Sequence, residues 1–112
     1  METLCIEMAP FTLAPGTSED QLLAASDRLE REFLATADGY LGRALSRLPD
    51  GRWTDVVLWR SREAAYAAMG RVHGSEACNA YFGCMVAEHA GAPENGVTLL
   101  AAARTFGVLR GL

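Results

Sequence analysis

The chain contains no lysine, so all ten of its basic residues are arginine. Without lysine there is no amine for Schiff-base catalysis, no anchor for pyridoxal phosphate and no P-loop lysine. The 14 Asp and Glu residues outweigh the arginines and leave a net charge of −4. The basic excess needed to bind a phosphate backbone is therefore missing, and we expect no nucleic acid partner.

Cysteine is scarce and long apolar runs are absent. The three cysteines form an odd set without a C-x-x-C pair, and the first residues carry Glu2 and Glu7 rather than a basic segment. The longest apolar run is far below the roughly 20 residues that cross a bilayer. We therefore expect a cytoplasmic protein without a membrane span.

Half of the 112 residues are hydrophobic, which is enough for one folded domain spanning residues 1–112. Alternating apolar positions indicate strands, and apolar residues three or four apart indicate helices. Pro49-Asp50-Gly51 predicts a hairpin turn, and Ser18, with Gln21 three residues later, predicts a helix cap. The predicted elements are a strand at 4–9, a helix from Ser18 to about Phe33, strands at 40–48 and 53–59, a helix from Ser61 to about His73, a short helix from Ser75 to Met85, and a strand from Val97 to about Phe106.

This order is β-α-β-β-α-β with an extra short helix before the last strand, which predicts a ferredoxin-like α+β fold with an antiparallel four-stranded sheet. Residues 56–59 and 99–103 are apolar at successive positions, so both faces of the sheet carry apolar side chains. The helices cover only one face. We therefore expect a homodimer formed through the other face of the sheet.

Three segments resemble the dimeric α/β-barrel superfamily: Pro15-Gly16, residues 38–43 (DGYLGR) and residues 53–65 (WTDVVLWRSREAA). By these motifs the chain is most similar to the antibiotic biosynthesis monooxygenase domain family, over residues 2–106. The resemblance implies two sheets that form a barrel in a dimer, and a pocket between sheet and helices in each subunit. Members include cofactor-independent oxygenases, haem-degrading enzymes, lactone isomerases and stress-responsive proteins.

Two candidate catalytic residues lie at the end of the strand 53–59 and in the helix after it. Trp59 ends this strand, where a tryptophan of the family often borders the pocket; the simpler interpretation, which we favour, is a core tryptophan whose indole N–H is bonded to a backbone acceptor. His73 has the chemistry of a general base, or it interacts with the carbonyls at the helix end. Family histidines near 68–69 and 77–79 have no counterpart here. Trp53, next to the hairpin turn, is expected to be exposed or at the edge of a dimer, and His89 is expected to be exposed.

The short helix after Ser75 supplies further candidates. Asn79, Tyr81 and Phe82 are predicted to roof the pocket, with Tyr66 on the preceding helix, although the same spacing suits ordinary packing. An oxygenase that uses its phenolic substrate as reductant needs an apolar cavity with a few hydrogen-bonding groups. We therefore predict that these four residues and Trp59 bind substrate, and that Asn79 is a third catalytic candidate.

Glu7 interrupts the apolar first strand. If it faces the pocket, its carboxyl has a raised pKa and the chemistry of a base. We favour the simpler interpretation, a cross-strand ion pair with Arg43 or Arg104 or a solvated edge. Cys78 and Cys84 are not spaced as metal ligands, so no metal and no cofactor is predicted.

Two functions remain from different classes. The first is a cofactor-independent monooxygenase-like protein that acts on a small aromatic or polyketide-like substrate. The second is a non-catalytic small-ligand-binding or stress-responsive dimer of the same fold. A haem-degrading role would require His73 to bind iron from a displaced position.

Overall fold

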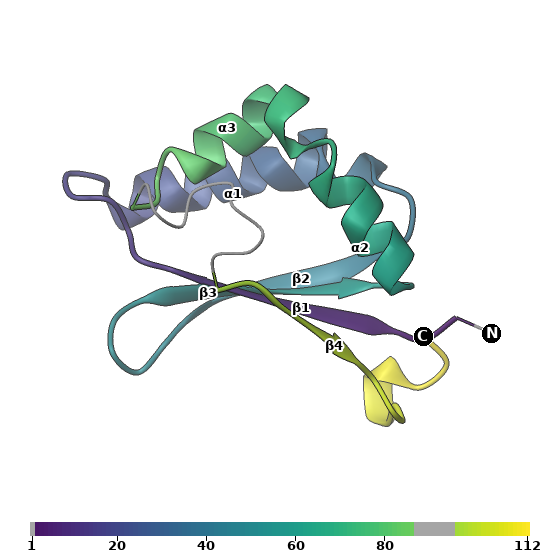
Figure 1. The fold of residues 1–112 in the computed structure, drawn as a ribbon. Helices are drawn as coiled ribbons and strands as arrows, with labels where there is room; N and C mark the ends of the chain where they lie inside the picture. Colours follow the sequence, from purple (N-terminus) through teal and green to yellow (C-terminus); the bar gives the residue numbers. More distant parts are fainter. Residues whose placement is uncertain (1, 87–95) are drawn as a thin grey trace.

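The computed structural model describes residues 2–86 and 96–112. Four strands form an antiparallel sheet in the order β2-β3-β1-β4, and all three α-helices cover one face of it (Figure 1). This arrangement confirms the predicted ferredoxin-like α+β fold. The elements are β1 (Cys5–Phe11), α1 (Glu19–Glu32), η1 (Leu34–Thr36), β2 (Tyr40–Arg47), β3 (Trp53–Trp59), α2 (Arg62–Met69), η2 (Val72–Gly74), α3 (Glu76–Phe82), β4 (Thr98–Ala101) and η3 (Gly107–Leu109).

The helix starts agree with the predicted caps. The Ser18 hydroxyl accepts a hydrogen bond from the Gln21 amide at 3.1 Å, and the Gln21 side chain accepts one from the Ser18 amide at 2.7 Å. Ser61 and Ser75 cap α2 and α3 in the same way, without the reciprocal bond. These bonds satisfy amides that a helix leaves without intrahelical partners.

Two strand boundaries differ from the prediction by more than one residue. β1 continues through Pro10 to Phe11, because β4 pairs only with residues 5–8 and the proline lies beyond that ladder. β4 ends at Ala101 instead of continuing to about Phe106. Ala101 pairs with Cys5, the first residue of β1, and one further backbone bond joins the Ala102 amide to the Leu4 carbonyl at 3.0 Å; beyond it, no described strand pairs with the apolar residues.

The core lies between the sheet and the helices. Successive strand residues point to opposite faces, so the odd-numbered residues of β1 and β3 face the helices. Trp53 shares this alternation and is buried, which corrects the expectation of an exposed side chain. The Arg47 guanidinium lies 4.8 Å from the centre of its ring. Residues buried in this core include Phe11, Leu22, Leu29, Trp59, Ala65, Cys78 and Tyr81.

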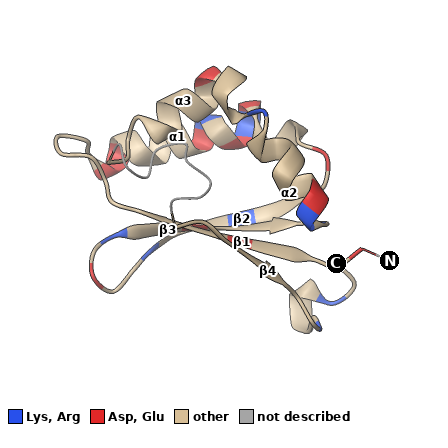
Figure 2. Cartoon of the chain, viewed as in Figure 1, with Lys and Arg blue, Asp and Glu red and all other residues tan. Residues whose placement is uncertain are grey.

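The other face of the sheet carries the predicted second apolar surface. Alternation and pairing place Ile6, Met8, Val56, Leu58 and Leu100 on it, and we call these five residues the open sheet face. Met8 and Leu100 are 38% and 42% exposed in the single chain. Charged residues gather in the helices and in the turn between β2 and β3, whereas β4 has none (Figure 2).

Within residues 2–86 and 96–112, no helix combines the length and the hydropathy of a membrane-spanning segment.

Candidate functional site

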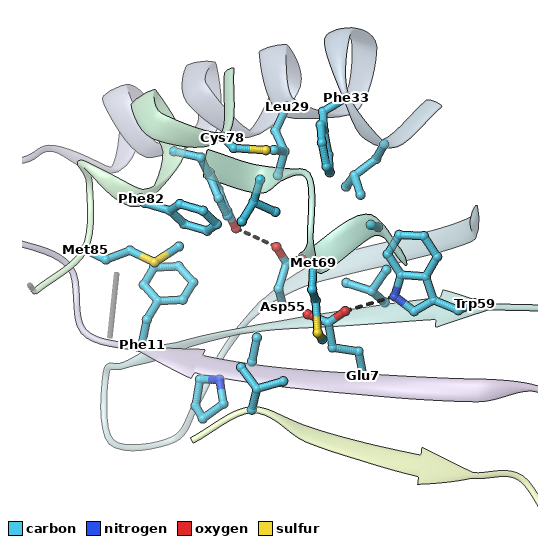
Figure 3. A pocket seen from close by; sticks show the side chains of 18 residues that line it. Glu7, Phe11, Leu29, Phe33, Asp55, Trp59, Met69, Cys78, Phe82 and Met85 are labelled. Carbon is cyan, nitrogen blue, oxygen red and sulfur yellow. Dashed lines mark hydrogen bonds between the residues drawn. The ribbon is translucent and has the colours of Figure 1, made fainter. Parts of the chain in front are cut away.

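A cavity of about 120 Å³ lies between the sheet and the helices (Figure 3). Its wall is mostly aliphatic, aromatic and sulfur-containing, and its polar groups are two carboxyls, an indole N–H and a phenol. The lining residues are Glu7, Ala9, Pro10, Phe11, Leu29, Phe33, Leu34, Asp55, Val57, Trp59, Ala68, Met69, Val72, Cys78, Tyr81, Phe82, Met85 and Val97. An apolar cavity with a few convergent polar groups is typical of a small-molecule site.

Glu7 lies on the cavity wall and is half-buried. Its Oε1 accepts a hydrogen bond of 2.9 Å from Nε1 of Trp59, which is buried at the end of β3. The expected ion pair of Glu7 with Arg43 or Arg104 is wrong. Glu7 lies on a central strand and points towards the core, and Arg43 pairs with Asp55 and Glu30 instead. Among residues 2–86 and 96–112, Glu7 has no ion pair.

The surroundings of Glu7 raise the pKa of its carboxyl group. Burial raises its pKa above the ordinary value, and the negative charge of Asp55 adds to this rise. The hydrogen bond from Trp59 acts in the opposite direction because it stabilises the carboxylate. A carboxyl with a raised pKa in a cavity is a candidate for proton transfer near neutral pH.

Asp55 is the second carboxyl of the cavity, and its oxygens are occupied. Oδ2 accepts a hydrogen bond of 2.7 Å from the Tyr81 hydroxyl, and Oδ1 accepts one of 2.9 Å from Nε of Arg43. The Arg43 guanidinium also lies 5.6 Å from the centre of the Tyr81 ring. The buried Asp55 carboxylate is therefore paired with one cation and hydrogen-bonded to one neutral donor.

The network continues away from the cavity. Arg43 also donates to the Ser26 hydroxyl and, at 3.3 Å, to Oε1 of Glu30. The Tyr40 hydroxyl donates to the same Glu30 oxygen at 2.7 Å. Burial raises the pKa of both Tyr40 and Tyr81 well above the ordinary tyrosine value, and the neighbouring carboxylates add to the rise. Both phenols therefore remain hydrogen-bond donors over the physiological pH range.

The structure brings three of the predicted site residues together. Trp59, Tyr81 and Phe82 all line the cavity. The indole N–H of Trp59 binds a side-chain carboxylate rather than a backbone carbonyl. Tyr81 presents its ring to the cavity while its hydroxyl is bound to Asp55.

The other predicted site residues lie outside the cavity. Tyr66 is 58% exposed on the outer side of α2, whose buried positions are Ala65 and Ala68. Asn79 is exposed beside the buried Cys78 on α3. α2 ends at Met69, so His73 falls in η2, where it is exposed. His89 lies outside the described residues.

Sequence analysis missed Asp55 as a member of the site. The available signal was an acidic residue inside an apolar strand, two positions before Val57 and four before Trp59, and hence on the same face. Two sulfur-containing side chains, Met69 on α2 and Cys78 on α3, also line the cavity.

The sulfur and acidic side chains do not form a metal site in the described parts of the chain. Within residues 2–86 and 96–112, no cluster of three His, Cys, Asp or Glu residues has the arrangement needed to hold a metal ion. The three cysteines are buried and unpaired, and burial raises the pKa of the Cys78 thiol. A buried, protonated thiol is a weak nucleophile.

The fold and the cavity define a class of protein: ferredoxin-like α+β proteins with a pocket between the sheet and the helices. No family model and no curated protein sequence matches the chain. Solved structures do match. SnoaB, a cofactor-independent oxygenase from Streptomyces nogalater, is 15% identical, with 92% of this chain and 96% of that chain covered and a TM-score of 0.69.

Two further structures widen the comparison. A protein from Bordetella bronchiseptica assigned as an antibiotic biosynthesis monooxygenase is 18% identical, with 94% and 100% of the two chains covered and a TM-score of 0.67. A haem-degrading protein from Mycobacterium tuberculosis is 16% identical, with 93% and 99% covered and a TM-score of 0.58. The chain thus has the fold of antibiotic biosynthesis monooxygenase domain proteins, as its motifs predicted. Because these structures differ in activity, the fold does not specify the reaction.

Proposed function

We propose that this chain is a cofactor-independent monooxygenase-like protein that binds a small aromatic molecule between the sheet and the helices. The observation that carries the proposal is an apolar cavity in which Glu7, alone among the carboxyls of the described lining residues, is not paired with a cation. The fold similarity to SnoaB, a cofactor-independent oxygenase, supports the same class of reaction.

The size of the cavity narrows the substrate class. A closed apolar cavity of about 150 Å³ admits benzene, so this partly open cavity of about 120 Å³ holds at most one aromatic ring. Polycyclic, polyketide-like molecules would need the walls to move apart. A hydroquinone meets the size limit because it is a single ring. It is also electron-rich, as a substrate that serves as its own reductant must be.

The overall reaction balances without a cofactor. One hydroquinone and one molecule of oxygen give one hydroxyquinone and one water. The substrate supplies all the electrons: one oxygen atom enters the ring, and the other leaves as water with two substrate hydrogens. The protein's contribution is to hold the ring, exclude bulk water and accept the hydroxyl proton.

Oxygen uptake tests this proposal. The purified chain with hydroquinone is expected to consume oxygen faster than autoxidation and to incorporate one labelled atom from heavy oxygen. Ala68 lines the cavity and Ala67 is exposed, so Ala68→Leu should abolish the uptake while Ala67→Leu should not. Circular dichroism checks that both variants are folded. No uptake above autoxidation by the folded wild-type chain would contradict the proposal.

The alternative is a non-catalytic protein that binds the same ligand. It is favoured by the exposure of His73 and Asn79, and by the engagement of Asp55 with Tyr81, which leaves few polar groups for oxygen chemistry. Calorimetric binding of hydroquinone without oxygen uptake would select this alternative. We do not propose haem degradation, because His73 lies on the surface away from the cavity.

We further propose a homodimer formed through the open sheet face. Five apolar side chains on one face of the sheet support it, and burying them against a second copy removes apolar area from water.

Three unpaired cysteines support a reducing, cytoplasmic location.

A further inference from the structure

We infer that Glu7 is the general base of the cavity and that its ligand is a neutral phenol, whose hydroxyl donates to the carboxylate oxygen that Trp59 leaves free. This inference rests on the proposed binding of an aromatic molecule in the same cavity. It names Glu7 as the residue that accepts the proton, and it specifies that the ligand binds without charge.

The first argument is geometric. Trp59 donates to Oε1 of Glu7, and no described residue donates to Oε2. The Glu7 side chain rises from β1 into the space bounded by Met69, Asp55 and Trp59 (Figure 3). Trp59 is itself held rigidly: its indole is 2% exposed and packs edge-on against Tyr40, with 5.7 Å between the ring centres. One carboxyl oxygen is thus fixed and the other is open to a ligand.

The second argument is the charge around Glu7. From β3 it faces Asp55, whose negative charge raises its pKa, and Arg43 on β2 is committed to Asp55 and Glu30. From α3 it faces the Tyr81 phenol, already bound to Asp55, and the protonated Cys78 thiol. The described lining residues on α1 and α2 are apolar, and so is Val97, which directly precedes β4.

This charge pattern selects the ligand. No described lining residue is a cation, so an aromatic carboxylate would meet two carboxyl groups with nothing to balance its charge. A neutral phenol brings the donor that Oε2 lacks and a ring that suits the apolar walls. A plain hydrocarbon ring fits the walls but leaves Oε2 unsatisfied.

The chemical step is a proton transfer. The O–H bond of the phenol breaks, its proton forms an O–H bond with Oε2 of Glu7, and the electron pair stays on the phenolate oxygen. Phenolate is the electron-rich form from which oxygen takes electrons in the proposed reaction. A raised carboxyl pKa narrows the difference from the pKa of a phenol, which makes the transfer less unfavourable.

The first experiment needs no turnover. Anaerobic calorimetry compares para-cresol with para-xylene, which has the same shape but a methyl group in place of the hydroxyl. In Glu7→Gln the amide oxygen keeps the bond from Trp59, and the amide nitrogen replaces the free acceptor. We expect the cresol-to-xylene affinity ratio to fall about tenfold in this variant. Glu63→Gln, an exposed carboxyl outside the cavity, is the matched control and should leave the ratio unchanged.

The second experiment measures hydroquinone oxidation against pH. In the wild type, kcat/KM should rise with pH through one ionisation and then level off; Glu7→Gln should lose that step and about 10²–10⁴-fold in rate. Glu7→Asp should retain the step, and circular dichroism checks its folding. An unchanged cresol-to-xylene ratio, or a Glu7→Gln rate equal to wild type, overturns the inference. A changed ratio without oxygen uptake upholds Glu7 as the phenol acceptor and contradicts the oxygenase proposal alone.

Discussion

Arg43 and Asp55 form an ion pair across neighbouring strands, with 2.9 Å between Nε and Oδ1, and each side chain is only 7% exposed. The register sets Asp55 opposite Leu45, so the pair is diagonal. Tyr81 on α3 and Ser26 on α1 complete the hydrogen bonding of the pair. One buried charge pair therefore connects two strands to two helices beside the cavity.

Breaking this pair should destabilise the fold. Arg43→Met leaves the Asp55 carboxylate buried without its cation, and we expect the free energy of unfolding to fall by about 3–5 kcal/mol. Arg52→Met, which removes an exposed pair with Asp50, should cost less than about 1 kcal/mol. Urea unfolding followed by circular dichroism measures both. Equal losses of unfolding free energy in the two variants would show that the buried pair contributes no more to stability than the exposed pair.

Glu7 should make stability depend on pH. Its pKa is higher in the folded chain than in the unfolded chain, so the folded state binds more protons between the two values. The free energy of unfolding should therefore decrease as pH rises from the ordinary glutamate pKa through the raised one. Glu7→Gln lacks this dependence and should be more stable than wild type above that window but not below it.

Unfolding midpoints in urea from about pH 4 to about pH 8 give this difference directly. Glu63→Gln serves as the control, because its carboxyl is exposed, and its difference from wild type should stay small throughout. A Glu7→Gln difference that is constant over the whole range would mean that the carboxyl is not perturbed by folding.

Gly39 should not tolerate a side chain. Its φ is +84°, and an added Cβ would lie 2.6 Å from Cβ of Ala64. Gly51 has a similar φ of +91° but no atom within 4 Å of an added Cβ. Gly51→Ala should cost only the conformational penalty of about 1–2 kcal/mol, and Gly39→Ala should cost about 1–3 kcal/mol more from overpacking. Thermal and urea unfolding compare the two, and equal losses would mean that the contact with Ala64 relaxes freely.

The open sheet face should control assembly. Sedimentation is expected to give a dimer at micromolar concentration, and Met8→Arg or Leu100→Arg should shift it towards monomer because a charge would be buried between the sheets. Tyr66→Arg changes an exposed apolar residue on the helical side and should leave the dimer intact. A wild-type monomer, or equal effects of all three variants, would contradict the proposed interface.

Local patterns predicted the elements well because their causes are local. The capping box at Ser18 and the caps at Ser61 and Ser75 each join residues three positions apart, and the range 53–59 of β3 follows from the seven residues of the strand and the turn before it. The predicted end of β4 was wrong because the cause of that end is not local. It depends on where β1 begins, 96 residues earlier at Cys5, and not on the apolar residues that follow Ala101.

The sequence by itself thus determined the order of elements, the ferredoxin-like fold and the two apolar faces of the sheet. Only the tertiary structure decided which side chains share the cavity. On α3, Tyr81 faces inward and Asn79 outward because packing against the core sets how far the helix is rotated. Glu7 meets Trp59 rather than an arginine because the pairing of β1 with β3 places Trp59 beside it, and Arg43 is held by Asp55 on the far side of β3.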